Sequence, residues 1–122
     1  MHRRTLLARA VLLASALAAV SPAWAGEAYP ARPIRLILPV APGGGQDTTA
    51  RAVSQKVTEN LGQSIIVDAR PGSGGAIAAG IASRAEPDGY TLLNISSTAV
   101  TTPLVMDVPY DVFRDFRPVS SS

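Results

Sequence analysis

The sequence predicts an α/β domain in which short parallel strands alternate with helices. Three apolar segments rich in Ile, Leu and Val recur along the chain, and helical patterns separate them. A loop rich in glycine or hydroxyl side chains follows each apolar segment. Strands that alternate with helices of 10–15 residues are typical of right-handed crossovers and a parallel sheet. The segments expected to form strands are residues 34–40, 64–69 and 90–95.

The first strand and helix follow from residues 34–62. Residues 34–40 (IRLILPV) are apolar between prolines, which predicts a strand buried on both faces. A loop is required at residues 41–45 (APGGG), and Asp47 is the expected N-cap of the helix that follows. Gly62 is the expected end of that helix. Apolar residues three and four positions apart predict one buried helix face: Ala50, Val53, Val57 and Leu61.

The second unit repeats the pattern. Residues 64–69 (SIIVDA) predict a strand, and residues 70–75 (RPGSGG) predict a second glycine-rich loop. The alanine-rich residues 76–85 predict a helix in which Gly80 permits close packing on a sheet. We expect Asp68 and Arg70 to pair at the end of the strand.

The third strand and the segment after it complete the pattern. Asp88-Gly89 marks the turn before residues 90–95 (YTLLNI). After the hydroxyl-rich loop 96–98, residues 99–106 predict a short helix limited by Pro103. Residues 108–118 have no regular pattern, and we expect their aromatic side chains to pack a loop onto the sheet: Tyr110, Phe113 and Phe116.

The first 25 residues predict an export signal. Arginines lie at positions 3, 4 and 9, an apolar run of 11 residues follows, and Ala23-Trp24-Ala25 forms a cleavage site. A membrane anchor is the alternative, but 11 residues are fewer than the roughly 20 that a spanning helix needs. Arg3-Arg4 partly resembles a twin-arginine signal, so the Sec and Tat routes both stay open. We expect a soluble mature chain, residues 26–122, outside the cytoplasmic membrane.

The composition excludes several function classes. The chain has no cysteine, and its single histidine is His2, so a mature enzyme would lack the commonest general base and soft metal ligands. Beyond residue 25 there are eight basic and nine acidic side chains, a net charge of −1 without the basic stripe that nucleic-acid binding needs. No nucleotide-binding glycine motif and no nucleophile elbow occur. We therefore expect no enzyme activity, no cofactor, no metal and no nucleic-acid partner.

Three loops at one edge of the predicted sheet suggest an anion site. Loops 41–46, 70–74 and 96–98 would all follow strands, and ligands of open α/β sheets bind beyond the carboxyl ends of the strands. Helix N-termini favour anions, and the hydroxyls of residues 96–98 can donate hydrogen bonds. Asp47 could contact an amine or hydroxyl of a ligand. Two alternatives remain open: the glycines serve only as turns, and Asp47 serves only as a cap.

The motifs also resemble those of the Bug/TctC family, the extracytoplasmic receptors of tripartite tricarboxylate transporters. The resemblance runs from Tyr29 to about Ser120. Its most specific strings are residues 29–35 (YPARPIR), 39–47 (PVAPGGGQD), 61–63 (LGQ), 70–75 (RPGSGG), 85–93 (AEPDGYTLL), 110–111 (YD) and 115–119 (DFRPV).

The resemblance implies a two-domain fold like that of type II periplasmic binding proteins, with a small carboxylate in the cleft and membrane permease subunits as partners. It implies a periplasmic location. Family members are much longer, so residues 26–122 are expected to be a truncated part of the N-terminal lobe. The implied ligand-binding residues are Pro42, Gly43, Gly44, Gly45, Asp47, Ser96, Ser97 and Thr98. A non-functional truncated product and a small exported enzyme are the alternative interpretations.

Overall fold

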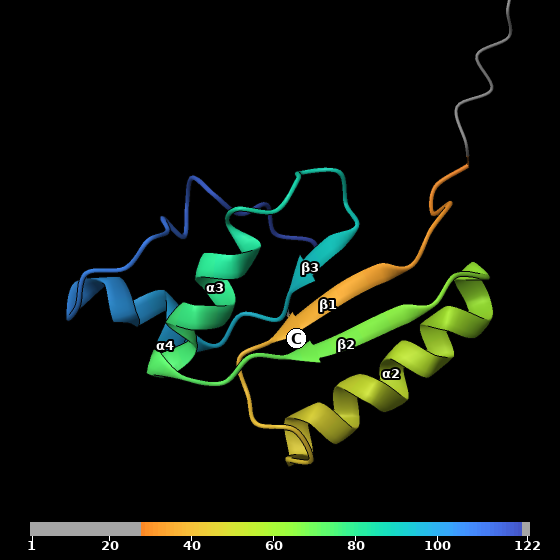
Figure 1. The fold of residues 1–122 in the computed structure, drawn as a ribbon, viewed down its shortest axis with the longest axis horizontal. Helices are drawn as coiled ribbons and strands as arrows, with labels where there is room; N and C mark the ends of the chain where they lie inside the picture. The colour runs from red at the N-terminus through yellow and green to blue at the C-terminus, as the bar shows by residue number, and fades with distance from the viewer. Residues whose placement is uncertain (1–27, 121–122) are drawn as a thin grey trace, which may run out of the picture.

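The computed structural model describes residues 28–120 and shows a three-stranded parallel sheet with helices on both faces (Figure 1). The expected export signal, residues 1–25, lies outside the described residues. The α/β class and the three parallel strands are confirmed. The strands are β1 (Ile34–Leu38), β2 (Ile65–Ala69) and β3 (Thr91–Leu93), and the α-helices are α2 (Gly45–Leu61), α3 (Ala76–Ala82) and α4 (Ser97–Thr101). One 3₁₀ turn, Ser73–Gly75, precedes α3, and another, Thr102–Leu104, follows α4.

The strand order is β2-β1-β3, so the first strand of the chain is the central one. The crossover through α2 leads to one side of β1, and the crossover through α3 leads to the other side. Because both crossovers are right-handed in parallel sheets, α2 and α3 must cover opposite faces, as Figure 1 shows. The strand order therefore reverses between β1 and β3, and the carboxyl ends of these strands form a topological switch point.

The core is centred on β1 and on the alanine-rich helix α3. Ile37 and Leu38 of β1 are fully buried, and so are Ala78 and Ala79 of α3. Small side chains let α3 approach the sheet closely. A Cβ atom at Gly80 would lie 3.1 Å from Pro109 Cγ, so Gly80 permits close packing on the segment before Tyr110 rather than on the sheet.

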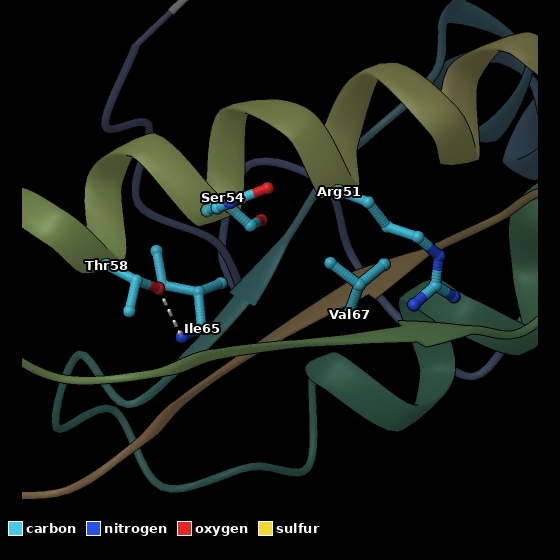
Figure 2. A pocket seen from close by; sticks show the side chains of 6 residues that line it. Arg51, Ser54, Thr58, Ile65 and Val67 are labelled. Atoms are coloured by element: carbon cyan, nitrogen blue, oxygen red, sulfur yellow. Dashed lines mark hydrogen bonds between the residues drawn. The ribbon is translucent and has the colours of Figure 1, made fainter.

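The buried face of α2 differs from the expected one. Asp47 and Ser54 are its buried residues, whereas Val53 is 57% exposed and Leu61 is 43% exposed. Polar contacts explain the rotation of the helix, because the Thr58 hydroxyl accepts a hydrogen bond from the amide of Ile65 at the start of β2 (Figure 2). Of the expected apolar face, Ala50 and Val57 are half-buried, whereas Val53 and Leu61 lie away from the sheet.

The segment after α4 is held by Tyr110. Its ring is buried and packs edge-on against Phe116 with ring centroids 6.1 Å apart, and burial raises the pKa of its phenol. The prediction that these two aromatic residues pack a loop is confirmed. The prediction for Phe113 is wrong, because this side chain is 94% exposed. The Asp111 carboxylate accepts from the Phe113 amide, and the turn that this bond closes directs Phe113 outward.

A hydrogen bond and an ion pair join the segment before β1 to the turn before β3. The Tyr29 hydroxyl donates to the Gly89 carbonyl at 2.8 Å, and Arg32 pairs with Asp88 at 2.6 Å. The Arg32 guanidinium also lies 4.3 Å from the centre of the Tyr90 ring. Among residues 28–120, no helix is long and apolar enough to cross a membrane.

Candidate ligand-binding site

The loops that follow the three strands meet at Gly75. A Cβ atom at this position would lie 3.2 Å from Pro39 Cβ, 3.0 Å from Ala99 Cβ and 3.6 Å from Ser96 Oγ. Pro39 follows β1, Gly75 follows β2, and the other two residues follow β3. Gly75 has φ +91°, a conformation that glycine adopts without strain. The glycine is therefore required both by its backbone angles and by the close approach of the neighbouring loops.

The loop after β1 presents an exposed backbone at the N-terminus of α2. Pro42, Gly43, Gly44 and Gly45 are all exposed, and Gly43 has φ +83°. The first amides of a helix have no partner within the helix, and they form the positive end of its dipole. The small residues leave these amides open to a ligand, since a Cβ at Gly43 or Gly45 would meet no atom within 4 Å.

Asp47 holds this loop in place, but it is not the N-cap that the sequence suggested. The helix begins at Gly45, Gly44 is the N-cap, and Asp47 is the third helical residue. From there its Oδ2 accepts from the Gly43 amide at 2.9 Å and from Arg51 Nε at 2.9 Å. The prediction failed because the positive φ of Gly43 turns the chain early enough for the helix to start two residues before Asp47.

The Asp47 carboxylate is charged and almost completely buried. The Arg51 guanidinium and, secondly, the Gly43 amide hold its pKa below the ordinary value for an aspartate. Its second oxygen, Oδ1, is buried and accepts no hydrogen bond from residues 28–120. The side chain thus fixes the glycine-rich loop and keeps one acceptor free beneath it.

The loop after β3 supplies hydroxyl groups. Ser96 is the N-cap of α4, and its Oγ accepts from the Ala99 amide at 3.3 Å. Ser97 and Thr98 are exposed in the first turn. A Cβ atom at Gly74 would lie 3.1 Å from the methyl group of Thr98, so the turn before α3 packs closely on α4. These hydroxyls therefore follow the strand next to β1, at the same sheet edge as the glycine-rich loop.

A separate charge cluster lies on β1 and β2. The expected pair is confirmed, because Arg70 Nε donates to Asp68 Oδ1 at 2.9 Å. The sequence did not reveal the second partner, Arg35, whose Nε donates to Asp68 Oδ2 at 2.9 Å. The Arg35 hydrogen bond is the main cause that lowers the pKa of Asp68, and Arg70 adds to it. A single charged residue in each of two apolar strands was the available signal for this pairing.

The described residues offer little to a metal ion. Within residues 28–120, no three His, Cys, Asp or Glu side chains lie close enough together to hold one. What the site offers is a set of hydrogen-bond donors: backbone amides of α2 on one side and hydroxyls of α4 on the other. Such donors suit an anionic oxygen.

Comparisons with known proteins find a matching family model and several relatives. A family model described as the tripartite tricarboxylate transporter family receptor matches residues 49–122. A UPF0065 protein of Bordetella bronchiseptica is 46% identical over 117 residues, which cover 93% of this chain and 35% of that protein. Protein BugT of Bordetella pertussis is 40% identical, and the match covers 86% of this chain and 33% of BugT. The chain thus spans about a third of the length of these relatives.

Solved structures show the same relationship. One described as a periplasmic transporter superimposes with a TM-score of 0.60 at 46% identity, over 69% of this chain and 29% of that one. Rpa4515 of R. palustris with adipate gives a TM-score of 0.51 at 37% identity, over 53% of this chain and 22% of that one. MatC of Rhodopseudomonas palustris with bound malate gives a TM-score of 0.50 at 38% identity, over 53% of this chain and 22% of MatC.

Proposed function

The chain belongs to the tripartite tricarboxylate transporter receptor family, and from this membership we propose that it forms one wall of the ligand site of an exported carboxylate receptor. Proteins of this family are solute-binding receptors and not enzymes. The proposed ligand is a small carboxylate, which a receptor of this kind delivers to membrane permease subunits. The proposed location is the periplasm, after removal of residues 1–25.

The observation that carries the proposal is the meeting of three loops at the carboxyl end of the sheet around Gly75. The exposed amides of Gly45 and Gln46 and the exposed hydroxyls of Ser97 and Thr98 lie on two of these loops. Each set could donate to a carboxylate, the amides as the positive end of the α2 dipole and the hydroxyls as neutral donors. Two related structures carry adipate and malate, which are dicarboxylates.

Asp47 has an indirect part in this proposal. Its carboxylate is turned under the loop to the Gly43 amide, and Arg51 balances its charge. The positive charge of Arg51, 2.9 Å away, offsets the repulsion between this carboxylate and an anionic ligand. We assign to Asp47 the positioning of the glycine-rich loop, while the open amides and hydroxyls contact the ligand.

A thermal melt of the exported, processed chain in millimolar malate, adipate, citrate or glutamate tests the proposal. A ligand that binds only the folded state raises Tm. We expect at least one acid to raise Tm, and its uncharged dimethyl ester to have no effect. Ser97→Ala should reduce the rise, whereas Ser64→Ala, at the opposite end of the sheet, should leave it unchanged. Equal effects of acid and ester, or none from any acid, would contradict the proposal.

A further inference from the structure

A chemically reactive dipeptide lies in the turn before β3. Asp88-Gly89 is the only place in the sequence where a glycine follows an Asp or Asn residue. The backbone nitrogen after an aspartate can attack the side-chain carboxyl carbon, and glycine has no side chain that hinders this approach. Both residues are exposed within the described part of the chain, and Gly89 has φ +82°. Solvent therefore reaches the two groups that would react.

The reaction rearranges the main chain without changing its mass. The Gly89 nitrogen forms a bond to Cγ of Asp88, and the amide proton leaves with a carboxyl OH group as water, which closes a succinimide ring. Water then adds to the main-chain carbonyl carbon of Asp88, and the bond from this carbon to the Gly89 nitrogen breaks. In the isoaspartyl product the chain runs through Cγ, and the former main-chain carbon becomes a free carboxylate. Water is the only co-reactant.

Contacts of the folded chain restrain the Asp88 side chain. Its Oδ1 accepts a hydrogen bond from the Tyr90 amide at 2.9 Å, and its Oδ2 pairs with Arg32 at 2.6 Å. The Arg32 guanidinium is itself held 4.3 Å from the centre of the Tyr90 ring. A carboxyl group that is bonded through both oxygens turns toward the Gly89 nitrogen less often than a free one. Because Arg32 belongs to the segment before β1, the restraint depends on the attachment of that segment.

The same turn carries the contacts that the reaction would alter. The Tyr29 hydroxyl donates to the Gly89 carbonyl at 2.8 Å, and a Cβ atom at Gly89 would lie 3.3 Å from the oxygen of this hydroxyl. Isomerisation inserts the Cβ atom of Asp88 into the main chain, which displaces the Gly89 carbonyl relative to Tyr29. It also moves the carboxylate that pairs with Arg32. Both contacts that join the segment before β1 to this turn are thereby disturbed.

We propose that Asp88-Gly89 is a site of spontaneous isoaspartate formation, that Arg32 slows the reaction in the folded chain, and that the modification releases the segment before β1 from the turn before β3. Attachment and modification oppose each other. While the segment is attached, the carboxylate is restrained, and once the residue has isomerised, the ion pair and the hydrogen bond cannot form again in the same geometry.

Peptide mapping by mass spectrometry, with enzymatic methylation of isoaspartyl groups, measures the reaction in the whole chain stored for weeks at neutral pH. We expect isoaspartate in the peptide that contains residue 88. Arg32→Ala should accelerate its formation about threefold, which is the order of effect that a surface ion pair has. Arg117→Ala removes another exposed arginine, far along the chain from this turn, and should leave the rate unchanged.

Salt separates the ion pair from a general loosening of the fold in the variant. Because salt screens exposed charges, a high concentration of sodium chloride should accelerate the reaction in the native chain and have no effect in Arg32→Ala. The chain enriched in isoaspartate should have a lower Tm than the fresh chain. No isoaspartate at residue 88, equal rates in the native chain and Arg32→Ala, or an unchanged Tm after modification would each overturn the proposal.

Discussion

The Asp47 carboxylate lies 2.9 Å from the amide of Gly43, so a side chain in the first turn of α2 closes the loop that leads into this helix. The same oxygen pairs with Arg51 one turn later. Loop and helix are thereby fixed to each other by one buried group, and this contact determines how the amides of the proposed site are presented.

Replacing Asp47 should therefore damage both folding and binding. Asp47→Ala removes the acceptor of the Gly43 amide and the partner of Arg51, and we expect a lower Tm and a smaller rise of Tm with the carboxylate. Asp107→Ala is the matched control, because Asp107 is exposed and makes no ion pair within residues 28–120. Equal melting curves of the two variants would show that the loop does not depend on Asp47.

Acid should destabilise the fold through paired carboxylates. The pKa values of Asp47, Asp68 and Asp115 are lowered in the folded chain, mainly by hydrogen bonds from Arg51, Arg35 and Arg114 respectively. The unfolded chain then binds protons at a higher pH than the folded one. The stability contributed by these groups is present above about pH 4 and is lost as the pH falls through the lowered values.

Urea unfolding between neutral and strongly acidic pH measures this dependence. Asp68→Asn should make the free energy of unfolding fall less steeply as the pH decreases, because one of the three groups with a lowered pKa no longer titrates. A decline that already begins near neutral pH would point to other groups and contradict the assignment.

Tyr110 should contribute through its hydroxyl as well as its ring. The hydroxyl donates to the Ala99 carbonyl at 2.8 Å in a buried setting. Tyr110→Phe keeps the ring contact with Phe116 but leaves the carbonyl unpaired, and we expect a loss of about 1 kcal/mol in the free energy of unfolding. Phe113→Ser, at an exposed position, should change it by less than about 0.5 kcal/mol. Chemical denaturation compares the two variants.

Gly75 should tolerate no side chain. In Gly75→Ala the new Cβ would lie 3.0 Å from Ala99 Cβ at a φ of +91°, so close packing and backbone strain act together. We expect a loss of about 1–3 kcal/mol in the free energy of unfolding. Gly45→Ala is the control for stability, since its Cβ would meet nothing within 4 Å in a helical position. If the two variants have the same free energy of unfolding, the three loops do not depend on close contact at Gly75.

The sequence predicted the elements that depend on local patterns. The apolar runs at β1, β2 and β3 stood out because parallel strands are buried on both faces, and the glycine-rich loops marked their ends. The set of loops at one sheet edge followed from the parallel arrangement. The sequence did not predict the strand order, because it depends on which side of β1 each crossover takes.

The details that failed depend on contacts between distant residues. The apolar stripe of α2 suggested a buried Val53, but the Thr58–Ile65 bond and the Asp47–Gly43 bond turn Ser54 to the sheet instead. The Arg35–Asp68 pair joins two strands whose register was unknown. Hydrophobic periodicity predicts which helix face is buried from the polarity of the side chains alone. It does not predict that a polar side chain is buried because it bonds to a particular distant residue.

The central place of β1 has a consequence for the order in which the chain can fold. Arg35 pairs with Thr91, which is 56 positions further along the sequence, and Ile34 pairs with Ile65 after 31 positions. As the chain emerges from a ribosome or a membrane pore, β1 comes first, has no strand to join until β2 has followed, and gains its second neighbour only with β3. Sheets closed by such distant pairs form slowly. Until then the side chains of Ile34, Ile37 and Leu38 lack the neighbours that bury them, and we expect this strand to need protection by a chaperone.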